Sequence, residues 1–393
     1  MLNVEHLGLL LAFLASLLVV VFIHPQVVRF AINRKMVDNP NERKLQRRPI
    51  PLMGGVAVFF GLVIGLCVAG FFVNIVSLLP ILLAMTIMLC VGIADDMSEL
   101  SPRIRFVIEI AMTVMMIFLT RTSLNNFQGL WGIGEVPMWA SIPLTIFAVV
   151  GIINAINLVD GVDGLSSGYC VMGSLAFSML FFAAGNILMT LLCLISVGSL
   201  LPFFFHNVFG KKSKMFIGDG GSLMMGVIMS SYVVLAISTG GECEEFAKSS
   251  GVGLVPFTLA VMSVPVFDTV RVMTMRIIRK TSPFSPDKTH LHHLFIELGF
   301  SHIGATACVL SLNVFVILMW WLSYRLGASV DIQFYVVVGC ALLVTAGFYK
   351  FMKIQIAHNT IVSRGARALS AMSHYENKKW WGVLQRIVDY KQN

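Results

Sequence analysis

Long apolar runs separated by short polar segments fill the chain from its start to about residue 351. A helix that crosses roughly 30 Å of hydrocarbon needs about 20 apolar residues, and eleven runs approach this length. We therefore predict an all-α, polytopic integral membrane protein with about eleven transmembrane helices. The predicted spans are residues 7–29, 51–73, 75–94, 104–120, 138–157, 168–184, 187–206, 221–239, 252–270, 303–324 and 332–351.

The composition supports this class. The 393 residues are 57% hydrophobic and 12% charged, whereas soluble domains carry about 25% charged residues. No polar stretch is long enough for a separate soluble domain, so residues 1–352 are predicted to form one transmembrane catalytic domain and residues 353–393 a cytoplasmic basic tail. The seven cysteines lie mostly inside predicted spans without C-x-x-C spacing, which predicts neither a disulfide framework nor a zinc site.

The basic residues predict the orientation, because loops rich in Lys and Arg stay in the cytoplasm. With the N-terminus outside, all but three of the 28 Lys and Arg residues are cytoplasmic, the exceptions being Arg121, Lys248 and Arg325. An odd number of spans then places the C-terminus in the cytoplasm. The net charge of +8 therefore requires no nucleic-acid partner. Glu5 and His6, rather than a basic segment, precede the first span, which predicts a retained helix and not a signal peptide.

Five aspartates occupy three short loops on the predicted cytoplasmic face. Asp95 and Asp96 close the third span, Asp160 and Asp163 follow the fifth, and Asp219 precedes the eighth. Ionised side chains at a membrane are costly and usually functional. We therefore predict that the five carboxylates form one site at the cytoplasmic edge of the membrane. The alternative is a structural role in helix caps and Asx turns.

Amides and glycines surround these carboxylates. Asn154 and Asn157 precede Asp160 by a few residues, and Gly218, Gly220 and Gly221 flank Asp219. Glycines at the start of a helix let a phosphate approach the backbone N–H groups. Three nearby lysines either neutralise that phosphate or mark the cytoplasmic side, namely Lys211, Lys212 and Lys214.

Three histidines, His290, His292 and His293, stand close together in the long loop after the ninth span. A closed zinc site needs four ligands, and the nearby cysteine or histidine partners that would complete such a site are missing. Donors directed at phosphate oxygens fit this cluster better than zinc ligands.

Together these motifs resemble the polyprenyl-phosphate N-acetylhexosamine-1-phosphate transferases of the WecA and TagO type, relatives of the MraY translocase of peptidoglycan synthesis. The resemblance runs from about residue 30 to residue 300 and rests on residues 43–44 with 49–55, 92–96, 154–165, 216–222 and 282–293. One position departs from the family: many members have a histidine two residues after Lys44, where this chain has Gln46.

The resemblance implies roles for individual residues. Asp219 matches the aspartate that binds Mg²⁺, for which Mn²⁺ is a substitute. The family's catalytic aspartates match Asp95, Asp96, Asp160 and Asp163. The residues implied to bind substrates are Lys44, Asn154, Asn157, Asn207, Phe216, His290, His292 and His293.

The implied activity is transfer of an N-acetylhexosamine 1-phosphate, with GlcNAc favoured, from a UDP-sugar to undecaprenyl or another polyprenyl phosphate. This reaction releases UMP and starts cell-envelope glycan synthesis at the bacterial inner membrane. His-Leu-His-His at 290–293, instead of three consecutive histidines, favours this over an MraY-like phospho-MurNAc-pentapeptide transferase. A homodimer is left open. A secondary transporter is the alternative from another class, although transporters bind substrates near the bilayer midplane and often contain repeats.

The chemistry of the substrates agrees with a site at the membrane edge, since the donor is soluble and the acceptor phosphate is anchored in lipid. A phosphate monoester has its second pKa near 6, so direct attack by the acceptor is favoured over a covalent aspartyl-phosphate route. Mg²⁺ usually takes one or two protein carboxylates, so five aspartates exceed the need of one ion.

Three further acidic or amphipathic features are predicted to lie outside the site. Glu109 and Asp268 fall within predicted spans. For Asp268 the sequence leaves two interpretations, a structural pair with Arg271 one helical turn later or a role in substrate binding. In the tail, apolar residues at helical spacing from Trp380 to Val388 predict an amphipathic helix on the inner leaflet, with a disordered tail as the alternative.

Overall fold

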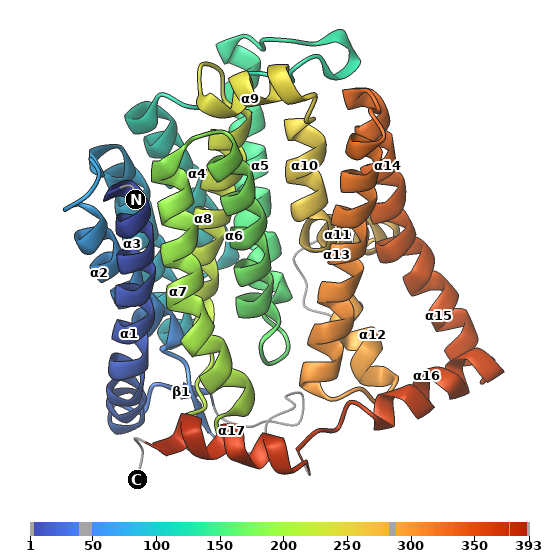
Figure 1. Ribbon diagram of the computed structural model, residues 1–393. Coiled ribbons are helices and arrows are strands. Elements are labelled where there is room, and N and C mark those ends of the chain that lie inside the picture. Colours follow the sequence, from blue (N-terminus) through green and yellow to red (C-terminus); the bar gives the residue numbers. More distant parts are fainter. Residues whose placement is uncertain (1–3, 39–48, 283–287, 377, 391–393) are drawn as a thin grey trace. The chain divides into compact units, whose positions relative to one another are not determined.

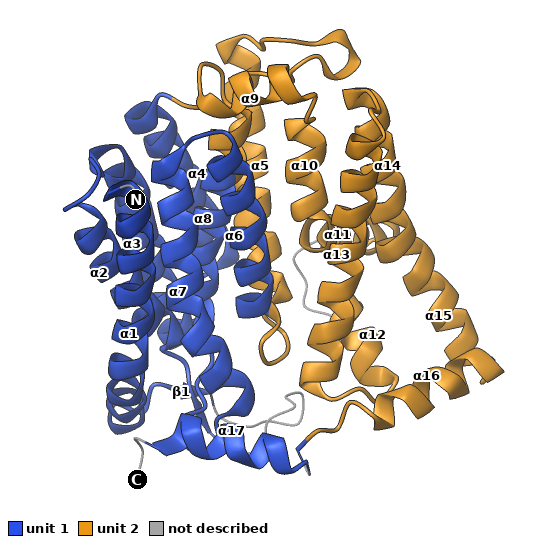
Figure 2. Cartoon of the chain, in the orientation of Figure 1, with its two compact units in different colours: residues 1–121, 166–232, 376–393 blue, residues 122–165, 233–375 orange. Residues whose placement is uncertain are grey.

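The computed structural model describes residues 4–38, 49–282, 288–376 and 378–390, and helices predominate in it (Figure 1). Lys44 and Gln46 lie outside the described residues, so the expectations for them stay predictions. The chain divides into two compact units that are each discontinuous in sequence (Figure 2). Unit 1 comprises residues 1–121, 166–232 and 376–393, and unit 2 comprises residues 122–165 and 233–375.

Each predicted span coincides with a helix or a pair of helices. Within the described residues, eight helices are long and apolar enough to cross a membrane, and one bent helix pair is a ninth candidate. Two predicted spans do not meet that standard: Gly54–Ala69 has 16 residues, and Pro102–Thr120 contains three charged side chains. The chain is therefore a polytopic helical membrane protein, whereas the number eleven and the sides of the termini stay predictions.

Unit 1 consists of helices with one short hairpin. Its elements are α1 (Val4–Asn33), β1 (Val37–Asp38), β2 (Ile50–Pro51), α2 (Gly54–Ala69), η1 (Val76–Leu78), α3 (Leu79–Ser98), α4 (Pro102–Thr120), α6 (Leu165–Ala183), α7 (Ile187–Phe209), α8 (Gly218–Ile237) up to residue 232, and α17 (Lys379–Asp389).

Small residues let α1, α2 and α7 pack closely. A Cβ on Gly61 of α2 would lie 2.6 Å from Cγ2 of Val20 in α1 and 2.7 Å from Oγ of Ser199 in α7. A Cβ on Gly65, one turn later, would lie 2.7 Å from Cγ2 of Ile195. Because lipid tails are as apolar as side chains, such close backbone packing is a main source of helix association in membranes. These glycines therefore hold together the helices that carry the first part of the site.

Unit 2 begins with the loop before α5 and continues, after the return of the chain to unit 1, from residue 233 to residue 375. Its elements are η2 (Leu130–Gly132), α5 (Met138–Val159), the last residues of α8, α9 (Glu242–Ser250), α10 (Leu254–Val261), α11 (Ser263–Ile278), α12 (Leu291–Glu297), α13 (His302–Arg325), α14 (Val330–Leu342), η3 (Leu343–Gly347), α15 (Phe348–Ala357) and α16 (Ile361–Ala371).

The ninth predicted span is broken, with α10 and α11 bent by 73°. A break in an apolar region leaves backbone groups without helical partners, and these must be satisfied by side chains. Asn313 of α13 does this: its Oδ1 accepts hydrogen bonds from Val264 N (2.9 Å) and Ser263 Oγ (3.0 Å), and its Nδ2 donates to Val261 O (3.1 Å). The buried asparagine therefore stabilises the bend that directs α11 toward the histidine cluster.

Candidate functional site

Two loops of unit 1 join at the start of α2. Gly54 N donates to Phe216 O (2.9 Å), and Gly55 N donates to Ile217 O (2.8 Å). Gly218, the next residue, has a φ of 72°, which glycine adopts without strain. The backbone is thereby fixed just before Asp219, which lies in the first turn of α8.

Asp96 and Asp219 lie next to each other in unit 1. The Asp96 carboxylate accepts hydrogen bonds from the backbone N–H groups of Asp219 and Gly220, the latter at 3.5 Å. Gly92 makes this possible, because a Cβ there would clash with the carbonyl carbon of Asp219 and the backbone of Gly220. The close approach of α3 and α8 thus places two carboxylates together that the sequence separates widely.

Asp95 has different partners from its neighbour. Its Oδ2 forms an ion pair with Arg105 Nη1 at 3.1 Å, and its Oδ1 accepts a hydrogen bond from Leu100 N at 2.8 Å. Arg105 also lies 3.6 Å from buried Glu109. Asp95 therefore holds the turn between α3 and α4 in this structure, and its catalytic role stays a prediction.

A cavity of about 250 Å³ opens beside Asp96. Its wall combines the Asp96 carboxylate with two basic side chains, and apolar residues complete it. The two basic side chains suit an anionic ligand, and the carboxylate suits a cation bound to that ligand. The lining residues are Arg34, Lys35, Met36, Val37, Leu52, Met53, Ile93, Asp96 and Met97.

The donor set fits a magnesium ion. Mg²⁺ is usually bound through one or two carboxylates together with water and substrate phosphates, and Asp96 and Asp219 supply two carboxylates beside each other. Across the part of the chain that the structure describes, no three His, Cys, Asp or Glu side chains cluster as a metal site of their own. The remaining ligands would therefore have to come from substrate and water.

Asn207 and Phe216 lie in the same unit. Asn207 is buried, and its Nδ2 donates a hydrogen bond to Met215 O at 2.8 Å. It therefore supports the segment that carries half-buried Phe216. Their expected contacts with uridine stay predictions.

In unit 2, Asp163 is held by α13. Its Oδ2 lies 2.6 Å from Nδ1 of His302, and its backbone carbonyl accepts a hydrogen bond from Thr306 Oγ1 at 2.9 Å. Sequence reasoning did not find His302. The one available signal was its place after Ser301, whose hydroxyl caps the helix by accepting from Gly304 N.

The histidine cluster begins at the N-terminus of α12. His290 and His292 are buried with parallel rings 5.8 Å apart, and the rings of His292 and His293 are 4.2 Å apart. Burial, followed by the neighbouring histidines, lowers the pKa of His292 to about 3. His292 is therefore neutral at neutral pH and can meet a phosphate only as an uncharged hydrogen-bonding group.

The loop after α5 contacts this cluster. A Cβ on Gly161 would clash with Nε2 of His292 and lie 2.7 Å from its Cε1. Asp160 is exposed, and its backbone N donates to Asn157 O at 3.1 Å. Asn154 Nδ2 donates to Val150 O at 2.9 Å within α5. The structure thus brings the end of α5 to the histidines, while one site shared with Asp96 and Asp219 stays a prediction.

Comparison with known proteins agrees with this chemistry. The sequence profile of Glycosyl transferase family 4 matches residues 78–237. A Bacillus subtilis protein, named probable undecaprenyl-phosphate N-acetylglucosaminyl 1-phosphate transferase, is 31% identical over 77% of this chain and 81% of its own length.

Two enterobacterial relatives are named undecaprenyl-phosphate alpha-N-acetylglucosaminyl 1-phosphate transferase. The Escherichia coli K12 protein is 29% identical over 68% of this chain and 70% of its own length. The Salmonella typhi protein is 30% identical over 70% of this chain and 72% of its own length. On these matches and the motifs described above, the chain belongs to Glycosyl transferase family 4, among the polyprenyl-phosphate N-acetylhexosamine-1-phosphate transferases.

Proposed function

We propose that the protein transfers N-acetylglucosamine 1-phosphate from UDP-GlcNAc to undecaprenyl phosphate and releases UMP. The observation that carries this proposal is the meeting of Asp96 and Asp219 beside a cavity lined by Arg34 and Lys35. The names of the relatives supply the sugar and the lipid.

An oxygen of the lipid phosphate forms a new bond to the phosphorus that carries the sugar. The bond from that phosphorus to the UMP oxygen breaks, and UMP leaves with the bonding electron pair. Asp96 and Asp219 would hold Mg²⁺, which would supply positive charge beside the diphosphate. Arg34 and Lys35 offset charge that develops on the leaving UMP.

The acceptor phosphate needs little help from a base, because most of it is already ionised at neutral pH. The resemblance to the family implies that Asp160, Asp163 and the three histidines also act on the substrates, and positioning the sugar and phosphates is the role that we propose for them. Neutral His292 suits this positioning role, since it can direct a hydrogen bond without carrying charge. Asp95 contributes by fixing Arg105 and the end of α3.

We also propose that the site faces the cytoplasm, with the N-terminus outside, the C-terminus inside and eleven spans. The strong bias of Lys and Arg toward one set of loops supports this orientation. An MraY-like pentapeptide transferase remains the runner-up. A transporter is disfavoured because the carboxylates lie at helix ends instead of mid-span.

The test is UMP release by purified protein in detergent, supplied with undecaprenyl phosphate, Mg²⁺ and a panel of UDP-GlcNAc, UDP-GalNAc and UDP-MurNAc-pentapeptide. UDP-GlcNAc is expected to give the highest kcat/KM. Turnover only with the pentapeptide donor would favour the runner-up. No UMP from any donor would overturn the proposal.

The metal role has its own test. Asp219→Asn is expected to raise the Mg²⁺ concentration for half-maximal activity by at least about tenfold, since a charged ligand to the ion is lost. Asp331→Asn, an acidic residue in the first turn of α14, is the matched control and should leave the titration unchanged. A normal titration for Asp219→Asn would refute its assignment as a ligand.

A further inference from the structure

The C-terminal helix α17 is fixed to unit 1 by an acidic anchor. The Asp389 carboxylate accepts hydrogen bonds from three successive backbone N–H groups, of Lys211 (3.2 Å), Lys212 (3.2 Å) and Ser213 (2.9 Å), and from Ser213 Oγ (2.8 Å). Consecutive N–H groups of this kind form an anion-binding concavity. Burial alone would raise the pKa of Asp389, but these hydrogen bonds lower it below its ordinary value. The anchor is therefore charged at neutral pH.

A second anchor is aromatic. The ring of buried Trp381 packs against Phe209 with centroids 4.6 Å apart. Phe209 is the last residue of α7, which is a candidate membrane span. The helix is thereby attached at the very end of a span, where headgroups meet water.

The remaining surface of α17 is apolar and basic. Trp380 is 47% exposed, Ile387 65% and Tyr390 79%, and they recur at helical spacing on one stripe. Lys378, Lys379 and Arg386 are also exposed. Asp389, the only acidic residue of α17, is turned toward Ser213 and so does not contribute to this surface. An apolar stripe flanked by positive charge is the surface that anionic membrane interfaces bind.

We propose that this face of α17 binds the phosphate headgroups of anionic lipids, and that Asp389 transmits this contact to the 211–217 segment. Three contacts hold this segment: Ser213 O contacts His24 Nε2 at 2.8 Å, Met215 O accepts from Asn207 Nδ2, and Phe216 O accepts from Gly54 N. It leads directly to Asp219. Binding lipid at α17 thus reduces the freedom of the backbone that positions the candidate metal ligand.

The test is hydrogen exchange of the full-length protein in nanodiscs made of phosphatidylcholine alone or with phosphatidylglycerol. In the wild type, phosphatidylglycerol is expected to slow exchange in residues 378–390 by at least about tenfold, since each basic residue near an anionic surface contributes roughly 1 kcal/mol. The triple variant Lys378→Gln, Lys379→Gln and Arg386→Gln should lose this response. Arg364→Gln with Arg367→Gln, on α16, is the matched control and should keep it.

The anchor is tested in the same membranes. Asp389→Ala should speed exchange in residues 211–217 while the apolar face still responds to phosphatidylglycerol. Equal exchange in both membranes would overturn the lipid proposal. So would protection that depends on protein concentration, because a second copy would then cover the face. No step of this test depends on enzymatic turnover, so it can fail while the proposed function holds.

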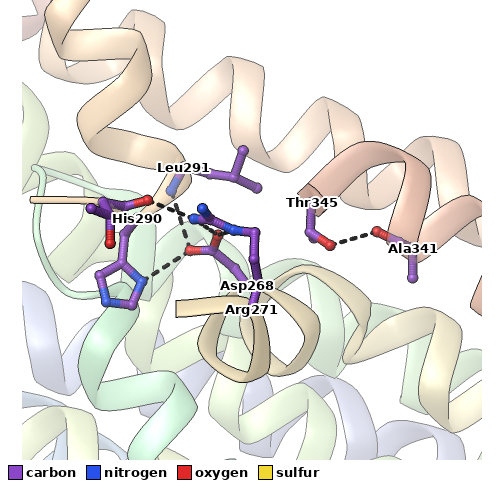
Figure 3. A network of polar contacts seen from close by, with 7 residues as sticks. Asp268, Arg271, His290, Leu291, Ala341 and Thr345 are labelled. Carbon is purple, nitrogen blue, oxygen red and sulfur yellow. Dashed lines mark hydrogen bonds and ion pairs between the residues drawn. The ribbon is translucent and has the colours of Figure 1, made fainter. Parts of the chain in front are cut away.

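Asp268 on α11 is 4% exposed. Figure 3 shows its carboxylate in a network of polar contacts with Arg271, His290 and Leu291. In agreement with one interpretation of the sequence, its Oδ1 binds Arg271 Nη2, at 2.6 Å. Its Oδ2, however, lies 3.0 Å from His290 Nδ1 and accepts a hydrogen bond from Leu291 N at 3.2 Å. The carboxylate therefore fixes the ring of His290 as well as the start of α12.

The other ring nitrogen of His290 is left for a ligand. His290 is 5% exposed, and its Nε2 has no hydrogen-bond partner among the described residues. A carboxylate accepts only, so Nδ1 donates its proton to Asp268. Nε2 can donate to a phosphate oxygen when the ring carries a proton on both nitrogens, a form whose positive charge the Asp268 carboxylate offsets. Arg271 reinforces the arrangement, since it donates to Thr289 O at 2.6 Å and stacks 3.8 Å from the ring centre of Tyr349.

We infer that Asp268 is a positioning residue that orients His290 Nε2 toward a phosphate of the substrate, an inference that rests on the proposed function. A double-mutant cycle tests it. Asp268→Asn is expected to lower kcat about tenfold, the effect of losing one hydrogen bond to a charged group. In a His290→Gln background the same change should cost little, because the residue through which Asp268 acts is gone.

Additive losses in the cycle would overturn the positioning role alone, whereas a wild type without turnover would overturn the proposed function and this inference with it. If Asp268→Asn does not fold, the cycle is run with Asp268→Glu, which keeps a charge for Arg271 but alters the reach to His290. Thermal unfolding of each variant separates loss of fold from loss of positioning.

Discussion

Replacing Gly161 by alanine tests whether the loop after α5 positions His292. A Cβ at this position would lie 2.7 Å from Cε1 and 3.0 Å from Cδ2 of the buried ring, and would clash with Nε2. Ordinary contact begins at 3.4 Å. The closest ring atom, Nε2, must therefore retreat by about 1.2 Å to reach ordinary contact, and a misplacement near 1 Å can lower a rate about 100-fold.

The expected result is a fall in kcat of about tenfold to 100-fold, with a loss of stability of about 1–3 kcal/mol from overpacking. The assay is UMP release at saturating UDP-GlcNAc, with thermal unfolding measured in parallel. Gly151→Ala is the matched control, because a Cβ there meets nothing within 4 Å. This control should keep full activity.

The same Gly161→Ala substitution in a protein that lacks the His292 ring separates the effect of the clash from other effects of the added methyl group. In a His292→Ala protein, Gly161→Ala should add little further loss, because the ring that it would displace is absent. Wild-type activity in the single Gly161→Ala variant would refute the reasoning. It would mean either that His292 is free to move without consequence or that it takes no part in the reaction.

Three further outcomes are expected. Gly92→Ala should lower kcat by more than roughly 100-fold, because the added Cβ forces Asp219 away from α3. Gly339→Ala is the control and should keep kcat, because a Cβ at that position meets nothing within 4 Å. His302→Ala should lower kcat about tenfold by releasing Asp163, the effect of one hydrogen bond to a charged group, and equal rates would refute that pairing. The unfolding temperature should fall as the pH drops below about 6.5. In that range His292 binds a proton in the unfolded chain, whereas in the folded protein its pKa of about 3 keeps the buried ring neutral. His292→Asn should reduce this dependence, and an unchanged slope would contradict the reasoning.

The class of the protein and the nature of its chemistry follow from the sequence. In hydrocarbon every backbone N–H and C=O needs a hydrogen-bond partner in the protein, and a helix supplies nearly all of these within its own segment, so long apolar runs become helices. This is why each predicted span coincides with helical structure. The aspartates, glycines and histidines of the short loops likewise mark polar chemistry at the ends of spans, because ionised groups in lipid are costly.

The partners of these residues were decided by tertiary structure alone. Asp95 and Asp96 are adjacent in sequence, yet one is paired with Arg105 and the other lies beside Asp219. The partnerships of Asp163 with His302 and of Asp268 with His290 have no local signature either. The pattern of apolar residues indicates only that a helix is buried in lipid or protein, and does not indicate which other helix it contacts. Which helix ends meet is set by the packing of small residues such as Gly92 against a distant backbone, and this depends on all the helices at once.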